Sequence, residues 1–474
     1  MPSIPFVGPS YQSRSLTLDA QRTVNLYPEV AEMGDSKRIA AMYGTPGLKK
    51  FVICPGSGGI RGLWKASTGD RVFAVRGASL YEIANGGGAT LHGTLESDSG
   101  PVSISDNGLQ LCIVDGTTSG YILTLADNTF AKITDPDFYG ADTVAFMDGY
   151  FIFNRIGTTQ FYISRLYDGF SYLGTDFSSA EGSPDHVAGV ISDHRELWVF
   201  GQQTSEVWYN SGDPDFPFDR IQGTFIEHGC IAPFSIAKMD NSVFWLGSDS
   251  RGSGMVWRAE GYQPRRISNH AVEYAISLYS NLEGVTGYAY QQDGHNFYVL
   301  NFETATWTYD AATGLWHERG TYNADGQLTR HRADCHVVGF GKNLVGDYED
   351  GRIYELDPST YTDDGAEIPR IRAAPYVSSN LQWLFHSSLQ VDMEAGVGLD
   401  AGATPGSTVN AMLDWSDDDG GTWSSEHWVS AGRIGERRQR IKWNRLGRAR
   451  DRIYRLKVTD PVKVAIVGAV LELA

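Results

Sequence analysis

The residues whose types and spacing most clearly suggest chemistry lie at positions 416–423, which read S-D-D-D-G-G-T-W. They match the Asp-box pattern S-x-D-x-G-x-T-W at every fixed position, namely Ser416, Asp418, Gly420, Thr422 and Trp423. Asp418 can accept amide hydrogens of a turn, the glycines permit positive φ, and Trp423 can pack under the hairpin. The motif therefore predicts a stabilised turn. The acidic run fails the calcium-loop spacing D-x-[DN]-x-[DN]-G, so calcium is not expected.

A second distinctive segment, residues 433–457, contains eleven Lys and Arg residues against Glu436 and Asp451. Its net charge is +9, so the rest of the chain, whose total is −18, carries −27. Alternation along strands would place several of these side chains on one exposed face. The residues expected there are Arg433, Arg437, Arg438, Arg440, Lys442, Arg445, Arg448, Arg450 and Arg452. An acidic protein partner, including a neighbouring copy, and phosphate are the favoured ligands, and a merely solvated face is the third alternative.

Motifs of the common catalytic classes are missing from the sequence, which has no G-x-S-x-G, H-E-x-x-H or G-x-x-x-x-G-K-[ST]. His331, Cys335 and His336 raise the question of zinc, but no second ligand cluster accompanies them. The four cysteines are far apart and are expected to be free thiols. We therefore predict no enzyme activity, no cofactor and no metal site.

The elements that must position these groups are β-strands in repeated hairpins. The clearest unit, residues 294–310, has two short apolar runs joined by a polar turn. Seven such hairpins, marked by Val72, Cys112, Ile152, Trp198, Phe244, Phe297 and Leu344, follow one another at steps of 40, 40, 46, 46, 53 and 47 residues. These steps fit β-propeller blades, whose period is roughly 40–50 residues. The sequence predicts an all-β fold with a propeller of about seven blades, six to eight being possible.

Composition divides the chain into four parts. Residues 1–45 contain four prolines and few alternating apolar runs, which predicts an extended N-terminal arm. The apolar run at 48–53 is a candidate for the strand that closes a propeller spanning residues 46–360. Polar, proline-containing residues 361–375 are predicted to form a linker, and the short alternating runs of 376–474 a C-terminal β-sandwich.

The overall charge of −18 disfavours the whole surface as a ligand for nucleic acid or an anionic membrane, because like charges repel at long range. No run approaches the ~18 apolar residues of a membrane span. The first residues lack the basic and apolar regions of a signal peptide, so synthesis in a host cytoplasm is expected.

Four motifs carry a resemblance to a known family. They are R-T-V-N-L-Y-P-E at 22–29, G-T-P-G-L at 44–48, G-D-Y-E-D-G-R-I-Y-E-L at 346–356 and W-N-R-L-G-R-A-R-D-R at 443–452. Together they resemble the packaged-DNA stabilisation proteins of short-tailed bacteriophages, which form the hub, or nozzle, of the tail. The resemblance spans nearly the whole chain, and the family has no catalytic residues to transfer.

The resemblance implies a virion structural protein that assembles as a homo-oligomeric ring, with about six copies, below the portal and head-to-tail adaptor proteins. Such a ring would extend the channel for double-stranded DNA, help to retain the packaged genome, and anchor tail fibres or tailspikes and tip proteins. The acidic remainder of the chain also suits a channel wall that does not bind passing DNA.

Two other functions stay open. Sialidases carry the Asp-box on propeller blades, so a glycan-binding or sialidase-like propeller is the main alternative. It would need an arginine cluster, a tyrosine and a carboxylate at the propeller centre, and it is disfavoured because the motif occurs once, outside the predicted propeller. The third function is a DNA-binding module that uses residues 433–457.

Overall fold

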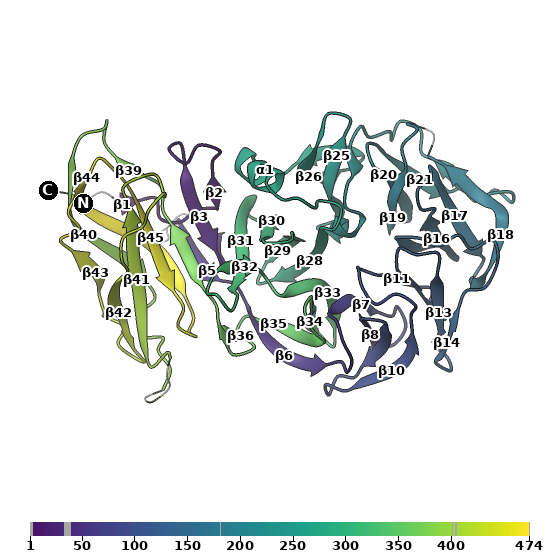
Figure 1. Cartoon of the computed structure of the whole chain (residues 1–474), viewed down its shortest axis with the longest axis horizontal. Coiled ribbons are helices and arrows are strands. Elements are labelled where there is room, and N and C mark those ends of the chain that lie inside the picture. The colour runs from purple at the N-terminus through teal and green to yellow at the C-terminus, as the bar shows by residue number, and fades with distance from the viewer. Residues whose placement is uncertain (1–2, 33–38, 181, 401, 403–404, 474) are drawn as a thin grey trace.

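Short β-strands make up nearly all of the computed structural model, which describes every residue except 1–2, 33–38, 181, 401, 403–404 and 474 (Figure 1). Within the described residues, one α-helix, α1 (His270–Ser277), and one 3-10 helix, η1 (Pro233–Ser235), interrupt the strands. Seen along its shortest axis, the molecule has a propeller at one end and a β-sandwich at the other (Figure 1).

Four consecutive sheets, each an antiparallel meander with four strands, begin the propeller. The first contains β7 (Ile60–Lys65), β8 (Val72–Arg76), β9 (Ser79–Ile83) and β10 (Ala89–Thr94). The second contains β11 (Ser103–Asp106), β12 (Gln110–Val114), β13 (Gly120–Thr124) and β14 (Thr129–Lys132). The third contains β15 (Val144–Met147), β16 (Tyr150–Asn154), β17 (Gln160–Arg165) and β18 (Asp168–Ser179), and the fourth β19 (Val187–Asp193), β20 (Glu196–Gly201), β21 (Ser205–Asn210) and β22 (Phe218–Arg220).

Three further sheets complete the circle. One contains β23 (Gly229–Cys230), β24 (Ala237–Met239), β25 (Ser242–Asp249), β26 (Gly252–Glu260) and β27 (Gln263–Arg266). The next contains β28 (Thr286–Gln292), β29 (His295–Asn301), β30 (Thr306–Asp310) and β31 (Leu315–Tyr322), with β32 (Leu328–Arg330) beside β31. The last contains β33 (Ala333–Gly339), β34 (Lys342–Asp347), β35 (Arg352–Asp357) and β6 (Gly47–Ile53), followed by β36 (Thr362–Asp363) and β37 (Ala366–Glu367).

The middle strands of the sheets read as apolar runs because each sheet is covered on both faces by its neighbours. In β8, β12 and β16, four of the five residues are buried. The outer strands β10 and β14 contain no buried residue, since they lie at the rim. Two-residue turns join many hairpins, and in the β28–β29 turn Asp293 and Gly294 both have positive φ, as a type I′ turn requires.

The propeller ring is closed by an early strand. Strand β6 pairs antiparallel with β35, with Ile53 opposite Arg352 and Leu48 opposite Leu356. The first propeller strand in the sequence therefore forms the outer part of the last sheet, which removes a free end from the circle. The expectation that residues 48–53 close the ring agrees with this pairing.

The sandwich has two sheets. One orders β4 (Leu26–Val30), β5 (Ala40–Gly44), β46 (Ala465–Leu473), β40 (Leu384–Met393) and β43 (Ile441–Asn444), with β1 (Ser3–Ile4) and β44 (Arg448–Ala449) at its sides. The other orders β3 (Ala20–Val24), β38 (Arg370–Ala373), β45 (Asp451–Val458), β41 (Thr408–Ser416) and β42 (His427–Arg433), with β2 (Tyr11–Gln12) and β39 (Val377–Ser378). Phe6, Leu26 and Met42 belong to the same apolar core as Leu389 and Leu471.

The N-terminal residues expected to form an extended arm are extended as five short strands, and these strands pair within the sandwich. Strand β3 also pairs with β31, so one continuous sheet joins the sandwich to the propeller. Strands β2 and β3, and β4 and β5, form local hairpins, but β1 and β3 also have partners far away in the sequence, with Ile4 opposite Ala469 and Arg22 opposite Ala373. No local pattern could reveal such pairing.

The motif at 22–29 fastens the two domains together. Arg22 forms a bidentate ion pair with Glu318 of β31, with its shortest N–O distance at 2.7 Å. The Asn25 amide donates both to the carbonyl of Gly320 in the propeller, at 2.8 Å, and to the carbonyl of Pro369 before the sandwich, at 2.9 Å. These contacts give the motif a structural role at the junction of propeller and sandwich.

Candidate functional site

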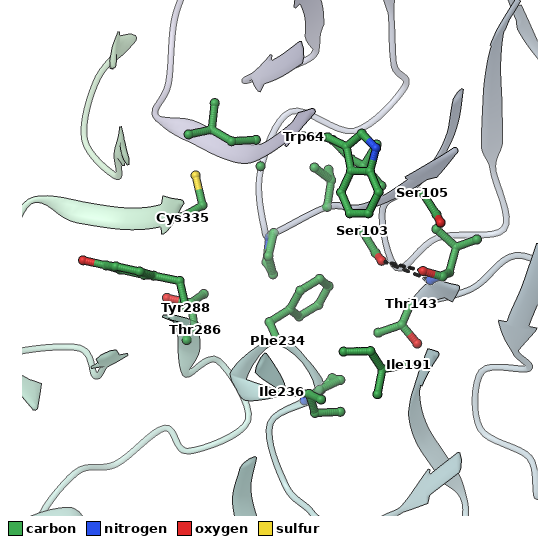
Figure 2. A pocket seen from close by; sticks show the side chains of 18 of the residues that line it. Trp64, Ser103, Ser105, Thr143, Ile191, Phe234, Ile236, Thr286, Tyr288 and Cys335 are labelled. Atoms are coloured by element: carbon green, nitrogen blue, oxygen red, sulfur yellow. Dashed lines mark hydrogen bonds between the residues drawn. The ribbon is translucent and has the colours of Figure 1, made fainter. Parts of the chain in front are cut away.

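The centre of the propeller is a cavity of about 300 Å³, lined by β7, β11, β15, β19, β28, β33 and the η1–β24 segment. Phe234 and Ile236 lie among its lining side chains together with Trp64 and Ile191 (Figure 2). The lining is mostly apolar or small and polar, as expected where the first strands of all the sheets converge.

The charged side chains that line this centre are Arg61, Lys238 and Asp334. Arg61, its one arginine, donates to the main-chain oxygens of Gly77, Ser97 and Ser99 at 2.8–2.9 Å, and is 8% exposed. Asp334, the one carboxylate among the lining residues, accepts from Thr286 at 2.7 Å and pairs with Arg330. The arginine cluster that a sialidase-like site would need is therefore missing from the described centre.

The three residues that raised the question of zinc have separate environments. Burial lowers the pKa of His331 to about 3, and its Nδ1 accepts the amide of Ala333. Cys335 lies at the edge of the propeller centre (Figure 2), while His336 bonds to Asn343 at 3.0 Å and stacks on Tyr288. No group of three or more potential ligands occurs among the described residues.

The Asp-box forms a closed network of hydrogen bonds between β41 and β42. The Asp418 carboxylate accepts from the amide and hydroxyl of Thr422, at 2.7 and 2.6 Å, and from the hydroxyl of Ser416 at 2.7 Å. These bonds, those from Thr422 above all, lower the pKa of Asp418 to about 2. The Gly420 amide donates to Ser416 at 2.8 Å, and the half-buried Trp423 ring lies 3.7 Å from the Arg455 guanidinium carbon.

The turn also holds the N-terminal hairpin. Asp419, whose φ is 60°, accepts from the hydroxyl of Thr17 at 2.8 Å and from the hydroxyl of Tyr376 at 2.9 Å. The same Tyr376 hydroxyl lies 2.6 Å from the carbonyl oxygen of Leu16, so its one hydrogen is shared between the two acceptors. The geometry of the Asp-box thus suits attachment of the β2–β3 loop to the sandwich, which the motif alone did not indicate.

The basic segment is divided into two groups at opposite ends of strand β40. Strand β43 pairs with β40 at Val391, whereas β44 pairs with it at Phe385, about 20 Å farther along. The loop group, at the β42–β43 connection, consists of Arg433, Arg437, Arg438 and Arg440, all exposed. The turn group, around β44, consists of Arg445, Arg448 and Arg450, also exposed.

Two of the expected interface residues are engaged inside the sandwich. Arg452 is only 2% exposed, because its guanidinium is held by Asp417 at 2.6 and 2.7 Å and by the carbonyl of Leu446. Its assignment to an exposed face was wrong. Lys442 is half-buried, with its Nζ 3.6 Å from Glu472.

The turn group lies beside exposed aromatic residues. The guanidinium carbons of Arg448 and Arg450 lie 4.7 and 5.1 Å from the centroid of the Trp383 ring, which is 49% exposed. Phe385 is 50% exposed on the same strand end. The loop group has no such aromatic contact and no ion pair among the described residues, so its charges are free to meet a partner.

The fold and these surfaces define a two-domain, all-β protein, a propeller joined to a sandwich that carries free arginines. Two family models match the chain, "Bacteriophage P22 Gp10, beta-propeller" over residues 2–361 and "Bacteriophage P22 Gp10, beta-sandwich" over residues 369–474. The chain therefore belongs to the bacteriophage P22 Gp10 family, the packaged-DNA stabilisation and tail hub proteins of podophages. The resemblance found in the sequence is confirmed, as is the all-β fold with a propeller and a sandwich.

Three solved structures with limited similarity were also found. They are the computationally designed Ika8 protein (12% identity, TM-score 0.41, 65% of this chain and 99% of that chain), the WD40 β-propeller domain of Doa1 (12%, 0.41, 65% and 97%), and the extracellular domain of the putative hybrid two component system BT4673 from B. thetaiotaomicron (9%, 0.45, 74% and 45%). No curated protein sequence matches the chain. In the described part of the chain, no helix is long and apolar enough to cross a membrane.

Proposed function

We propose that this chain forms the hub, or nozzle, ring of a phage tail, below the portal and adaptor proteins. In this role it extends the DNA channel, helps to retain the packaged genome, and anchors tail fibres or tailspikes and tip proteins. The observation that carries the proposal is the family match, which covers the propeller and the sandwich almost without a gap.

The path of the DNA is constrained by the propeller centre. The cavity there measures only about 300 Å³ and is lined by side chains such as Phe234. A B-DNA duplex is wider than its major groove, which alone is about 12 Å across. A duplex therefore does not fit through the cavity of one propeller. The channel in this proposal therefore runs between copies of the chain, which makes a ring necessary for the function.

The charge of the chain supports a non-adhesive channel wall. A net charge of −18, with 11 of the 39 Lys and Arg residues gathered at 433–457, repels a polyanion over most of the surface. We expect that reversing the charge of acids that face the channel slows DNA ejection, because phosphate contacts would then have to be broken as the duplex moves. Unchanged ejection kinetics would show that the wall charge has no such role.

The test of the proposal uses particles assembled without this chain. If it helps to retain the genome, such particles will fill with DNA and then lose it, and adding purified protein to freshly filled particles will prevent the loss. The measurement is the amount of nuclease-protected DNA per particle over time. Particles that keep their DNA and infect normally without the chain would contradict the proposal.

A further inference from the structure

A cleft of about 700 Å³ lies on the rim of the propeller, over the outer strands of the third and fourth sheets. We call it the rim cleft. Its apolar lining comes from Phe177, Trp208, Tyr209, Phe216 and Phe218, and its charged lining from Asp213, Asp215, Asp219 and Arg220. Tyr209 is 42% exposed and Phe177 38% exposed, which is unusual for large aromatic side chains of a sheet.

The carboxylates of the rim cleft lack basic partners within the chain. Asp213, Asp215 and Asp219 are exposed, and none forms an ion pair with any described residue. Arg220, the one base in the lining, is already 3.2 Å from Glu206, which is almost fully buried. The cleft therefore combines open aromatic faces with three uncompensated negative charges, a combination that suits arginine-rich protein surfaces.

The loop group on the sandwich has the complementary chemistry. Arg433, Arg437, Arg438 and Arg440 are exposed and form no ion pair with a described residue. Glu436, the one acid among them, accepts the backbone amide of Arg433 at 2.8 Å. A guanidinium can stack on an aromatic ring and pair with a carboxylate at the same time, which a lysine does less well.

These two surfaces cannot meet within one molecule. The rim cleft lies on β18, β21 and β22 in the part of the propeller farthest from the sandwich, whereas the loop group joins β42 and β43 at the other end (Figure 1). Two different, complementary patches on one chain create a head-to-tail contact, and a closed ring larger than a dimer is built from such contacts.

We propose that the loop group of one copy docks in the rim cleft of the next copy around the ring. The inference rests on the ring proposed above and identifies its contact. Arginine side chains would enter between the exposed rings of Phe177 and Tyr209 and pair with Asp213 and Asp215. High salt will weaken the contact, because both partners are exposed before they meet.

The test is a charge swap, read as copies of this chain per purified particle. We expect Asp213→Lys with Asp215→Lys, and separately Arg437→Glu with Arg438→Glu, to lower the copy number about tenfold or more, since like charges at an interface cost several kcal/mol. The four changes together should restore it. Arg448→Glu with Arg450→Glu, a matched reversal in the turn group, should leave it unchanged.

Unchanged copy number in both reversed pairs, or no recovery in the combined variant, would overturn the contact while leaving the hub function intact. Absence of the unaltered chain from particles would instead overturn the hub function. If only the arginine reversal lowers copy number and it also abolishes salt-sensitive duplex binding, the loop group binds DNA and the inference is wrong. Thermal melting of each variant tests whether the variant still folds, so that a loss of the contact is distinguished from a loss of folding.

Discussion

At the residue scale, buried polar side chains hold the N-terminal segment in place. Arg372 is fully buried in β38 and donates to the carbonyls of Phe6 and Pro9 at 2.7 and 2.8 Å. It also donates to Thr23 at 2.9 Å and Gln21 at 2.7 Å. All four acceptors come from the first 23 residues, so one guanidinium organises the whole segment.

Arg372→Lys should lower the free energy of unfolding by about 2–4 kcal/mol, because lysine cannot reproduce the planar fork and leaves buried acceptors without donors. The N-terminal segment should also become sensitive to protease. Arg14→Lys, at an exposed position in the same segment, is the control and should change little. Equal stability of the two variants in urea unfolding would contradict this role of Arg372.

His317 should make the protein sensitive to acid. It is fully buried, and neither ring nitrogen has a hydrogen-bond partner among the residues that the structure describes. Burial, with Arg319 as the next cause, lowers its pKa well below the usual value. The unfolded state therefore binds a proton that the folded state excludes, so this residue causes stability to be lost as pH falls below about 6.5.

His317→Leu should remove that loss. We expect the variant to be about 1 kcal/mol more stable than the natural chain at pH 7, because two unpaired polar atoms disappear, and the difference to grow at pH 5. Urea unfolding at several pH values measures this, with the exposed His270→Gln as the control. A pH dependence identical to that of the natural chain would contradict the assignment.

At the element scale, strand β6 is the closure of the propeller. Gly47 begins it, and a Cβ at this position would lie 2.5 Å from the carbonyl oxygens of both Thr360 and Thr362. The backbone at these two threonines cannot move aside as a flexible side chain can. Even one added methyl group should therefore disturb the pairing of β6 with its neighbours.

Gly47→Ala should lower stability by about 1–3 kcal/mol and increase hydrogen exchange in β6 and β35 first. The matched control is Gly86→Ala, an exposed glycine whose added Cβ would meet nothing within 4 Å, and it should change stability by less than about 0.5 kcal/mol. Faster exchange spread evenly over all the sheets would argue against a role of β6 as the closing strand.

Local elements could be predicted from the sequence, whereas pairing between distant strands could not. The hairpins and the Asp-box turn depend on residues close in sequence. The run at 48–53 could be predicted as a strand from its own apolar residues, although its partner β35 lies far along the chain. The sandwich strands at the N-terminus depend on β38 and β46, more than 300 residues away. For the same reason the basic segment looked like one face, although β40 separates its two groups and Asp417 buries Arg452.

At the scale of the whole molecule, the bonded junction of the two domains and the narrow propeller centre support one view of function. Arg22 and Asn25 fix the sandwich to the propeller, so the loop group and the rim cleft keep a constant relation. A constant relation between two complementary patches gives every contact the same rotation, and the ring closes when this rotation divides a full turn. In the ring proposed here, the path of the DNA runs between copies, where no single chain blocks it.

The most direct test of this view is quantitative mass spectrometry of density-purified particles of the phage that encodes the chain. The number of copies of this chain is compared with the number of portal copies. A ring below the portal predicts a fixed small ratio, about six copies to roughly twelve of the portal. Absence of the chain from the particles, or a copy number that varies between preparations, would contradict the account.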